Sequence, residues 1–310
     1  MSSEAQITDS VIMIRPASFT SNPETAASNS FQAELGEADP AEVRVQAQRE
    51  FAHLADALEA AGVRVFRFED TPEPETPDAL FPNNWLSTHA DGVAILYPME
   101  APSRRTERRR DILDTLSQHH SYHCQALEDL SHYEEKARYL EGTGSLILDR
   151  VNRIAYACLS SRTHPALFHD WCERFDYEPE AFTARNEGQE IYHTNVMMCL
   201  GEHFAVICDE AIEDEQERIR VLSRLEKTGH QVISITLGQM NQFAGNMLQL
   251  KSGDGTRVIA MSDQALECLS DFQRQALESH GRIVSADIRT IETYAGGSVR
   301  CMLAENFLPR

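Results

Sequence analysis

The sequence predicts an α/β protein that contains many short strands. Short apolar runs suited to strands, such as residues 11–15 and 154–158, alternate several times with stretches of helical spacing, such as residues 213–227. A length of 310 residues is large for one ordinary core, but barrel-like and propeller-like α/β folds hold it in one domain. We therefore expect residues 1–310 to form one domain.

The first predicted elements are a strand, a helix and a second strand. After the first strand, residues 41–61 carry apolar side chains at helical spacing, and Gly62 suits the C-terminal end of this helix. Residues 63–68 predict the next strand. A proline-rich, acidic loop at 71–77 then leads into residues 81–85, Phe-Pro-Asn-Asn-Trp, and loops in such a place often hold substrates.

The same alternation continues to the end of the chain. Apolar runs predict strands at 92–97, 145–149, 154–158, 196–200, 203–208, 232–236, 247–251, 257–261, 282–285 and 301–304. Helical spacing predicts helices at 103–118, 165–174, 213–227 and 263–279. We find no internal repeat in the residues themselves.

The charge of the chain argues against two classes of partner. There are 28 Lys and Arg against 49 Asp and Glu, which gives a net charge of -21. A strongly acidic chain repels phosphate backbones and anionic lipid surfaces, so we expect neither a nucleic acid nor a membrane as partner. The oligomeric state, including a homo-oligomer, stays open.

The compartment is expected to be the cytoplasm. Residues 1–6 lack the basic and apolar regions of a secretory signal, and no apolar run approaches the roughly 20 residues that span a bilayer. The seven cysteines are odd in number and lack the spacing of a disulfide framework, which suits a reducing compartment.

A glycine pair delivers one cysteine near the chain end, in the segment Gly296-Gly297-Ser298-Val299-Arg300-Cys301. A lone cysteine is usually an inert buried residue, but this one follows a flexible turn and begins a short apolar run. A thiol with an ordinary pKa of about 8.5 is mostly protonated at neutral pH, so a nucleophile needs a base or a positive environment. Arg300 and His193 are the candidates for that help.

Four segments upstream complete a recognisable order. They are Phe81-Pro82-Asn83-Asn84-Trp85, Leu140-Glu141-Gly142-Thr143-Gly144-Ser145, Ser161-Arg162-Thr163 and Tyr192-His193-Thr194-Asn195. This order resembles the guanidine-modifying (pentein) superfamily of arginine deiminases, dimethylargininases and amidinotransferases, and most of all its citrulline utilisation hydrolases, or citrulline ureidases. The likeness runs from about Ile12 to Phe307 and implies a five-fold pseudosymmetric α/β propeller of ββαβ units around a central site.

The resemblance implies three catalytic residues. Cys301 would be the nucleophile and His193 the acid and base, while Glu141 would orient the histidine and support its protonated form. The family's version of the Glu141 segment usually ends in Asp, and this sequence has Gly144 there. A carboxylate common in deiminases is therefore missing.

Two asparagines carry the argument about the substrate. Arginine-handling relatives place aspartates where this sequence has Asn84 and Asn195, with Asn83 as an adjacent rival for the first position. A guanidinium offers only donors and suits paired carboxylates, whereas a neutral ureido group has one carbonyl acceptor and several donors. An asparagine amide matches the ureido pattern, which favours citrulline. Some dihydrolases that convert arginine to ornithine also use an asparagine at the first position, so arginine stays open.

Further residues complete the expected site. Arg162 matches a family arginine that grips the substrate's α-carboxylate in a bidentate fork, and Arg15 is a second candidate. Asn246 falls in a family-like segment and is expected to have a structural role. A run of basic residues at 104–110 suggests a solvated helix face. The histidines and cysteine at 119–124 lack the spacing of a zinc site, so no metal is expected.

The expected reaction is covalent and uses no metal and no cofactor. Cys301 attacks the ureido carbon of a small amino-acid substrate, and L-citrulline gives ornithine, carbon dioxide and ammonia, with the order of the leaving groups open. Three alternatives remain: an arginine dihydrolase or deiminase, an amidinotransferase, and a catalytically silent pentein that acts as a scaffold.

Overall fold

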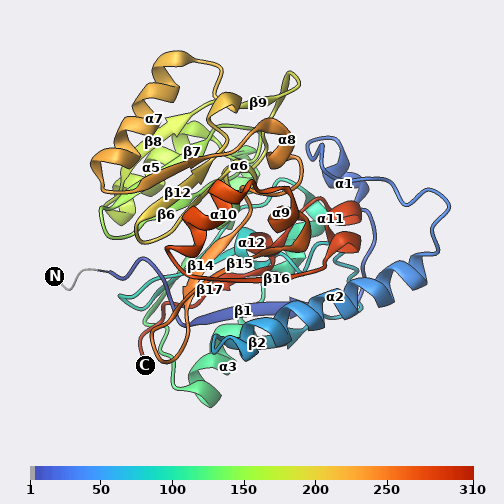
Figure 1. The fold of residues 1–310 in the computed structure, drawn as a ribbon. Coiled ribbons are helices and arrows are strands. Elements are labelled where there is room, and N and C mark those ends of the chain that lie inside the picture. Colours follow the sequence, from blue (N-terminus) through green and yellow to red (C-terminus); the bar gives the residue numbers. More distant parts are fainter. Residues whose placement is uncertain (1–3) are drawn as a thin grey trace.

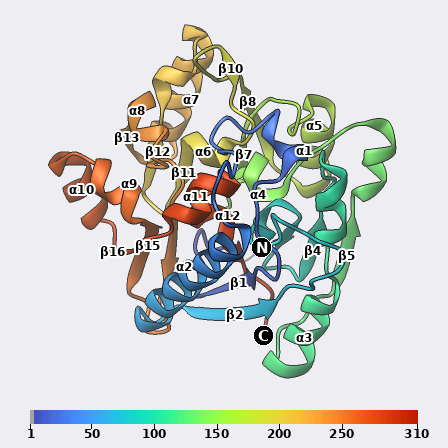
Figure 2. The same ribbon diagram turned by 90° about the vertical axis from the view of Figure 1, so that its right-hand side faces the viewer.

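Five small three-stranded sheets form the framework of the computed structural model, which describes residues 4–310 (Figures 1 and 2). The sheets are β17 (Ala304–Glu305), β1 (Ser10–Arg15) and β2 (Arg64–Glu69); β3 (Leu86–Thr88), β4 (Val93–Leu96) and β5 (Ala126–Asp129); β6 (Ile147–Asp149), β7 (Ile154–Cys158) and β8 (Glu178–Phe182); β11 (Met198–Leu200), β12 (Phe204–Ile207) and β13 (Gln231–Ser234); β14 (Leu248–Lys251), β15 (Arg257–Ser262) and β16 (Arg282–Ala286).

Every sheet repeats one topology. The first strand pairs antiparallel with the central strand, and the central strand pairs parallel with the third. A parallel pair needs a crossover, and helices supply it: α2 (Pro40–Ala60), α3 (Asp111–His120), α5 (Pro165–Phe175), α7 (Glu215–Lys227), and α9 (Asp263–Cys268) with α10 (Asp271–Glu278). The expected five-fold propeller of ββαβ units is confirmed.

The remaining elements are short. They are α1 (Pro23–Ala26), α4 (Gly142–Ser145), α6 (Thr194–Met197), α8 (Leu237–Met240), α11 (Arg289–Ala295), α12 (Val299–Met302), the 3-10 helices η1 (Pro82–Asn84), η2 (Pro102–Glu107), η3 (Ser131–Lys136) and η4 (Asp209–Ala211), and the hairpin of β9 (Arg185–Asn186) and β10 (Gln189–Glu190). No helix within residues 4–310 is long and apolar enough to cross a bilayer.

The first module shows how the sequence specifies its elements. Helix α2 begins at Asp39, whose side chain accepts the backbone N–H of Ala41, and Pro40 occupies the first helical position. The helix stops before Gly62, which has a φ of +87° that favours glycine, and a Cβ there would lie 2.8 Å from Cβ of Ser252. A side chain at position 62 would therefore meet both backbone strain and a clash.

Strand β1 is buried on both faces. Val11 and Met13 pack in the core beneath α2, whereas Ile12 and Ile14 pack in the neighbouring core with the second module. Because successive side chains of a strand point to opposite faces, one strand supplies two cores and joins adjacent modules. The modules are thereby fixed around a common centre.

Several predicted elements differ from the structure. The strands expected at 145–149 and 196–200 begin two residues late, at β6 and β11, because helical turns α4 and α6 occupy their first residues. Residues 301–304 do not form a strand: Cys301 lies in α12, where Ser298 O accepts the Cys301 backbone N–H, and β17 begins only at Ala304. The helix expected at 103–118 divides into η2 and α3. The helix expected at 263–279 divides into α9 and α10, because a capping box of Ser270 and Gln273 starts a new helix.

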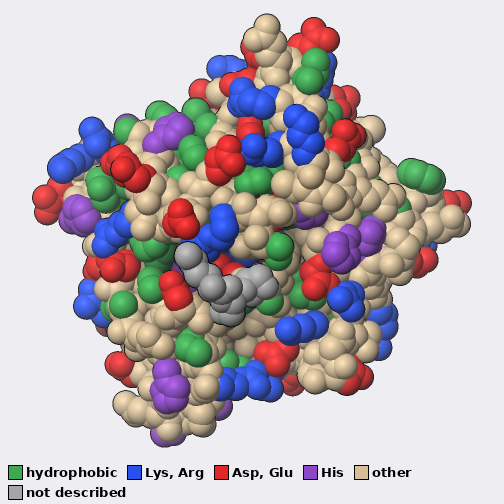
Figure 3. Space-filling view, turned by 90° about the vertical axis from the view of Figure 1, so that its left-hand side faces the viewer, with side chains coloured by type: hydrophobic (Ala, Val, Ile, Leu, Met, Phe, Trp, Pro, Cys, Tyr) green, Lys and Arg blue, Asp and Glu red, His purple; other side chains and the backbone are tan. Residues whose placement is uncertain are grey.

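Charged side chains are mixed on the face shown in Figure 3. Lys and Arg lie among Asp and Glu over the part of this face that the structure describes. The basic run at 104–110 is only partly solvated: Arg104 is 2% exposed and points inward, which corrects the expectation of a solvated helix face.

Candidate active site

One turn of helix precedes the first strand of four modules, and these turns supply the site residues. Asn84 ends η1, Glu141 precedes α4, His193 precedes α6, and Cys301 lies in α12. In the remaining module Asn246 closes a turn before β14, with its N–H bonded to Phe243 O at 2.8 Å. Strand ends that converge from five modules bring residues far apart in sequence to one place.

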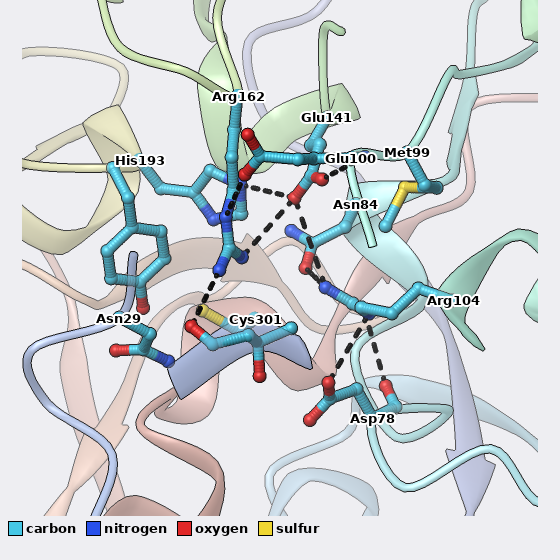
Figure 4. A network of polar contacts seen from close by, with 12 residues as sticks. Asn29, Asp78, Asn84, Met99, Glu100, Arg104, Glu141, Arg162, His193 and Cys301 are labelled. Atoms are coloured by element: carbon cyan, nitrogen blue, oxygen red, sulfur yellow. Dashed lines mark hydrogen bonds and ion pairs between the residues drawn. The ribbon is translucent and has the colours of Figure 1, made fainter. Parts of the chain in front are cut away.

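A small cavity lies at this centre, and Figure 4 shows several of the residues around it. Its volume is about 10 Å³, close to the space that a single water molecule needs. The lining residues are Thr25, Asn29, Asp78, Phe81, Asn84, Arg104, Arg162, Tyr192, His193, Ala295, Gly296, Gly297 and Cys301. Thr25 and Asn29 belong to the segment around α1, so this segment covers the site.

Cys301 presents its sulfur to the cavity from α12 and is 4% exposed. Two side-chain amides contact the sulfur: Nδ2 of Asn195 and Nδ2 of Asn246 each lie 3.3 Å from Sγ. The Oδ1 atom of Asn195 is buried without a hydrogen-bond partner. Asn195 contacts the sulfur from behind and is not among the residues that line the cavity.

His193 and Glu141 form a buried pair, with 2.8 Å between Nε2 and Oε2. Burial lowers the pKa of His193 to about 4, although the Glu141 carboxylate opposes the shift, so the imidazole is neutral at pH 7. Burial disfavours the charge on Glu141, but Arg162 and His193 outweigh it and hold its pKa at about 2. Because Glu141 engages Nε2, Nδ1 is the ring nitrogen left for proton transfer.

Arg162 crosses the cavity toward the covering segment. It donates to Ser28 Oγ at 2.7 Å and Thr25 O at 3.3 Å, and its Nη1 lies 3.6 Å from Oε2 of Glu141. Its guanidinium carbon lies 4.7 Å from the centre of the Tyr192 ring. Its hydrogen-bond acceptors are thus neutral, while the carboxylates of Glu100 and Glu141 lie somewhat further from the guanidinium, at 3.5 and 3.6 Å.

Of the two neighbouring asparagines, Asn84 lines the cavity. Its Oδ1 accepts from Arg104 at 2.9 Å, and its Nδ2 donates to Oδ1 of Asn83 at 3.1 Å. Asn83 lies behind it and outside the lining. Gly144 packs against the same group: a Cβ there would lie 2.5 Å from Nδ2 of Asn84 and 2.8 Å from Nδ1 of His193. The family's aspartate does not fit this arrangement.

The structure places Arg15 away from the cavity. It lies at the end of β1, where it pairs with Glu69 at 3.0 Å and donates to Oε1 of Gln48. It is not among the lining residues. The structure thus gathers the other predicted residues and leaves Arg15 in a partly exposed ion pair.

Sequence reasoning missed Arg104 and Asp78. Arg104 donates to both carboxylate oxygens of Glu107 at 3.0 Å. Burial lowers the pKa of Arg104, but the carboxylates of Glu107 and Asp78 outweigh burial and raise it above its ordinary value. Oδ2 of Asp78 accepts from Asn22, but its Oδ1 is buried without a partner. The signal for Arg104 was the proline at position 102, which turns the start of the basic run inward as a 3-10 helix. The only sequence signal for Asp78 was its position shortly before the Phe-Pro-Asn-Asn-Trp segment.

The sequence matches a known protein family over most of its length. The sequence model described as N,N dimethylarginine dimethylhydrolase, eukaryotic, matches residues 15–308. The chain belongs to this family. Membership is consistent with the pentein superfamily named above. No protein with a curated description matches the chain.

Solved structures of similar proteins have the same fold. The arginine dihydrolase ArgZ of cyanobacteria matches with a TM-score of 0.73 at 16% identity over 97% of this chain and 41% of that one. The N-terminal domain of ArgZ bound to product gives 0.72 at 16% identity, over 97% and 99% of the two chains. A dimethylarginine dimethylaminohydrolase adduct with S-methyl-L-thiocitrulline gives 0.64 at 16%, over 97% and 100%. The chain therefore spans less than half of full-length ArgZ, and these matches show the pentein fold.

Proposed function

We propose that this protein is a cysteine-dependent hydrolase of the ureido group of L-citrulline, with ornithine, carbon dioxide and ammonia as products. The observation that carries the proposal is the shared cavity of Cys301, His193, Asn84 and Arg162. A nucleophile, a proton carrier and groups for both ends of an amino acid thus line one cavity.

The amino-acid end of the substrate has two candidate partners. The α-carboxylate would replace the neutral acceptors of Arg162, Ser28 Oγ and Thr25 O, with a charge-assisted bidentate pair. The α-ammonium would bind Asp78, whose Oδ1 has no partner among the described residues. The opposite charges of the zwitterion would then both be matched.

The ureido end would meet the asparagines. The Oδ1 atom of Asn195 accepts from a ureido N–H, while its Nδ2 lies beside the sulfur, next to the carbon under attack. When the ureido carbonyl becomes an oxyanion, an amide donor stabilises it, whereas an aspartate would repel it. This difference favours a ureido group over a guanidinium.

The chemistry proceeds in two halves. His193 Nδ1 takes the thiol proton, Cys301 Sγ bonds to the ureido carbon, and the ionised Glu141 supports the resulting imidazolium. Collapse of the tetrahedral intermediate breaks one carbon–nitrogen bond, and His193 protonates the departing nitrogen. Loss of ornithine leaves an S-carbamoyl enzyme. Water, deprotonated by His193, then releases carbamate, which breaks down to carbon dioxide and ammonia.

L-Arginine is a second candidate substrate. The family match and the fold similarity to the arginine dihydrolase ArgZ favour it. The citrulline ureidase likeness of the sequence stays part of the proposal, as do Cys301, His193, Glu141, Asn84, Asn195 and Arg162 in their roles.

The test incubates purified protein with L-citrulline, L-arginine and N,N-dimethylarginine in separate reactions, with ornithine, citrulline and ammonia measured over time. Ornithine from citrulline is the expected result. Ornithine from arginine alone would establish the dihydrolase reaction, and citrulline from dimethylarginine would establish the reaction in the family's description. The Cys301→Ala variant is the blank in each arm, and equal product in that blank would refute the cysteine mechanism.

A further inference from the structure

Asn246 holds three partners at the centre of the site, and none of the roles assigned above includes it. Its Nδ2 donates to Asn195 O at 2.8 Å and lies 3.3 Å from Cys301 Sγ, while its Oδ1 accepts the backbone N–H of Arg300 at 2.9 Å. The side chain is 0% exposed. It therefore joins the turn before β14, in the fifth module, to the turns that carry the histidine and the cysteine.

These contacts fix the orientation of the amide. An asparagine has two N–H donors on Nδ2 and an acceptor on Oδ1, and the two ends are assigned from their partners. The Arg300 N–H can only donate, so Oδ1 must face it. Nδ2 then faces the Asn195 carbonyl and the sulfur, one hydrogen for each. A flipped amide would place two donors together at Arg300.

The sulfur needs such donors because its neighbours do not provide an ion pair at rest. The pKa of His193 lies at about 4 because of burial, so the imidazole is uncharged at pH 7. The titratable and charged side chains that line the cavity with the thiol are Asp78, Arg104, Arg162, Tyr192 and His193. Arg104 and Arg162 are engaged by carboxylates at Glu107 and Glu141. Neutral amide dipoles are the groups in direct contact with Sγ.

We propose that Asn246 is a positioning residue for the nucleophile: with Asn195 it forms a pair of amide donors that favours the thiolate of Cys301 and aims its sulfur. The inference rests on the proposed function, because it takes Cys301 as the nucleophile. If this is so, the fifth module, which supplies no other residue of the site, controls the reactivity of the Cys301 thiol through Asn246. Two donors converging on one atom stabilise its charge without adding a charge that a neutral substrate would have to match.

The experiment measures how fast iodoacetamide alkylates Cys301 as a function of pH, with the site identified by peptide mass spectrometry. Asn246→Ala removes the donor, and we expect the midpoint of the rate profile to move up by at least about one pH unit, the size of a hydrogen bond to a charged group. Asn246→Asp keeps an acceptor for Arg300 N–H but places a carboxylate beside the sulfur. We expect a larger upward shift for Asn246→Asp than for Asn246→Ala.

Activity gives a second readout. With the substrate that the wild type turns over, Asn246→Ala should lower kcat by about 100-fold, as loss of one preorganised donor does elsewhere, while KM changes little. Asn306→Ala is the matched control, because Asn306 is also buried, at 1% exposure, but contacts Leu308 rather than the sulfur. The control should leave the alkylation midpoint in place.

A purely structural role would give a different pattern. Asn246→Ala would then lower the melting temperature more than Asn246→Asp, and both midpoints would stay at the wild-type pH, which would overturn the proposal. If Asn246→Ala does not fold, the Asn246→Asp profile decides alone. Alkylation needs no substrate, so failure to turn over citrulline or arginine would refute the proposed function and leave this test intact.

Discussion

Glu292 accepts a hydrogen bond from Ser298 Oγ through Oε1 at 2.6 Å, and Ser298 O in turn accepts the backbone N–H of Cys301. The carboxyl group is 3% exposed, and its Oε2 has no partner among the described residues. Burial raises its pKa to about 7, with the negative charge of Glu50 adding to the effect. The turn that carries the cysteine is thus held by a carboxyl group that titrates near neutrality.

The first prediction concerns stability between pH 5 and 8. Folding raises the pKa of Glu292 from 4.5 to about 7, so the folded state binds the proton more tightly. The contribution of Glu292 to the free energy of unfolding is full below pH 4.5. It is lost as the pH rises through 7, and the loss amounts to up to about 3 kcal/mol. Glu292→Gln should therefore lose less stability than wild type between pH 5 and 8 in urea unfolding. Glu278→Gln, an exposed control, should follow the wild type, and equal pH dependence in all three would contradict the assignment.

Cys301→Ala and Cys301→Ser should abolish turnover, by at least about 10⁴-fold, while circular dichroism stays unchanged. The matched control is Cys199→Ala, because Cys199 is also 4% exposed and lies in the apolar core. Alkylation provides an independent check, since a nucleophilic Cys301 should react faster than the other six cysteines. Retained turnover in either Cys301 variant would remove the nucleophile from the mechanism.

Gly144→Ala should damage the site without an electrostatic change. The new Cβ would lie 2.5 Å from Nδ2 of Asn84 and 2.8 Å from Nδ1 of His193, so one of them must move. Displacement of a catalytic group by about 1 Å can cost about 100-fold in rate. We expect a loss of that order in kcat, whereas Gly253→Ala, with no atom within 4 Å of the new Cβ, should match the wild type. A fully active Gly144→Ala variant would show that catalysis does not require Asn84 and His193 to keep their present positions.

Glu141→Gln should lower kcat by about 10² to 10⁴-fold, because the imidazolium that forms during attack loses its anionic partner. The matched control is Glu180→Gln, which removes a buried carboxylate that pairs with Arg220 at 2.6 Å outside the cavity. Steady-state kinetics at pH 7 compares the two. Similar losses in both variants would point to a general effect of losing a buried carboxylate rather than to catalysis.

Much of the fold was predictable because its cores are built from continuous apolar runs. Strand β7 was predicted with its observed bounds, and α2 within one residue at each end. Strands β3 and β5 were not predicted, because segments of three or four residues that mix polar and apolar side chains show no detectable hydrophobic period. The sequence of α12 predicts the start of a strand, because a helix of four residues is too short to show a helical period.

The site was predictable where a residue belongs to a distinctive segment, as with Cys301, His193 and Glu141. Arg104 was not predicted, because its burial depends on long-range contacts with Asp78 and Asn84 in addition to the local pair with Glu107. The structure also makes a weak repeat recognisable: Asn84, Gly144, Asn195, Asn246 and Cys301 are each followed two positions later by Leu or Met. Five short matches among 310 residues stand out only when the modules align them.

The pairing of β17 with β1 gives the site an order of assembly. Val11 pairs with Glu305 and Ile12 with Ala304, so the ring closes only when residues near both ends of the described chain meet. Cys301 lies three residues before that seam, whereas Glu141 and His193 belong to modules made earlier in synthesis. A growing chain can therefore fold most of the pocket before Cys301 has been synthesised. The site becomes able to react only when β17 pairs with β1.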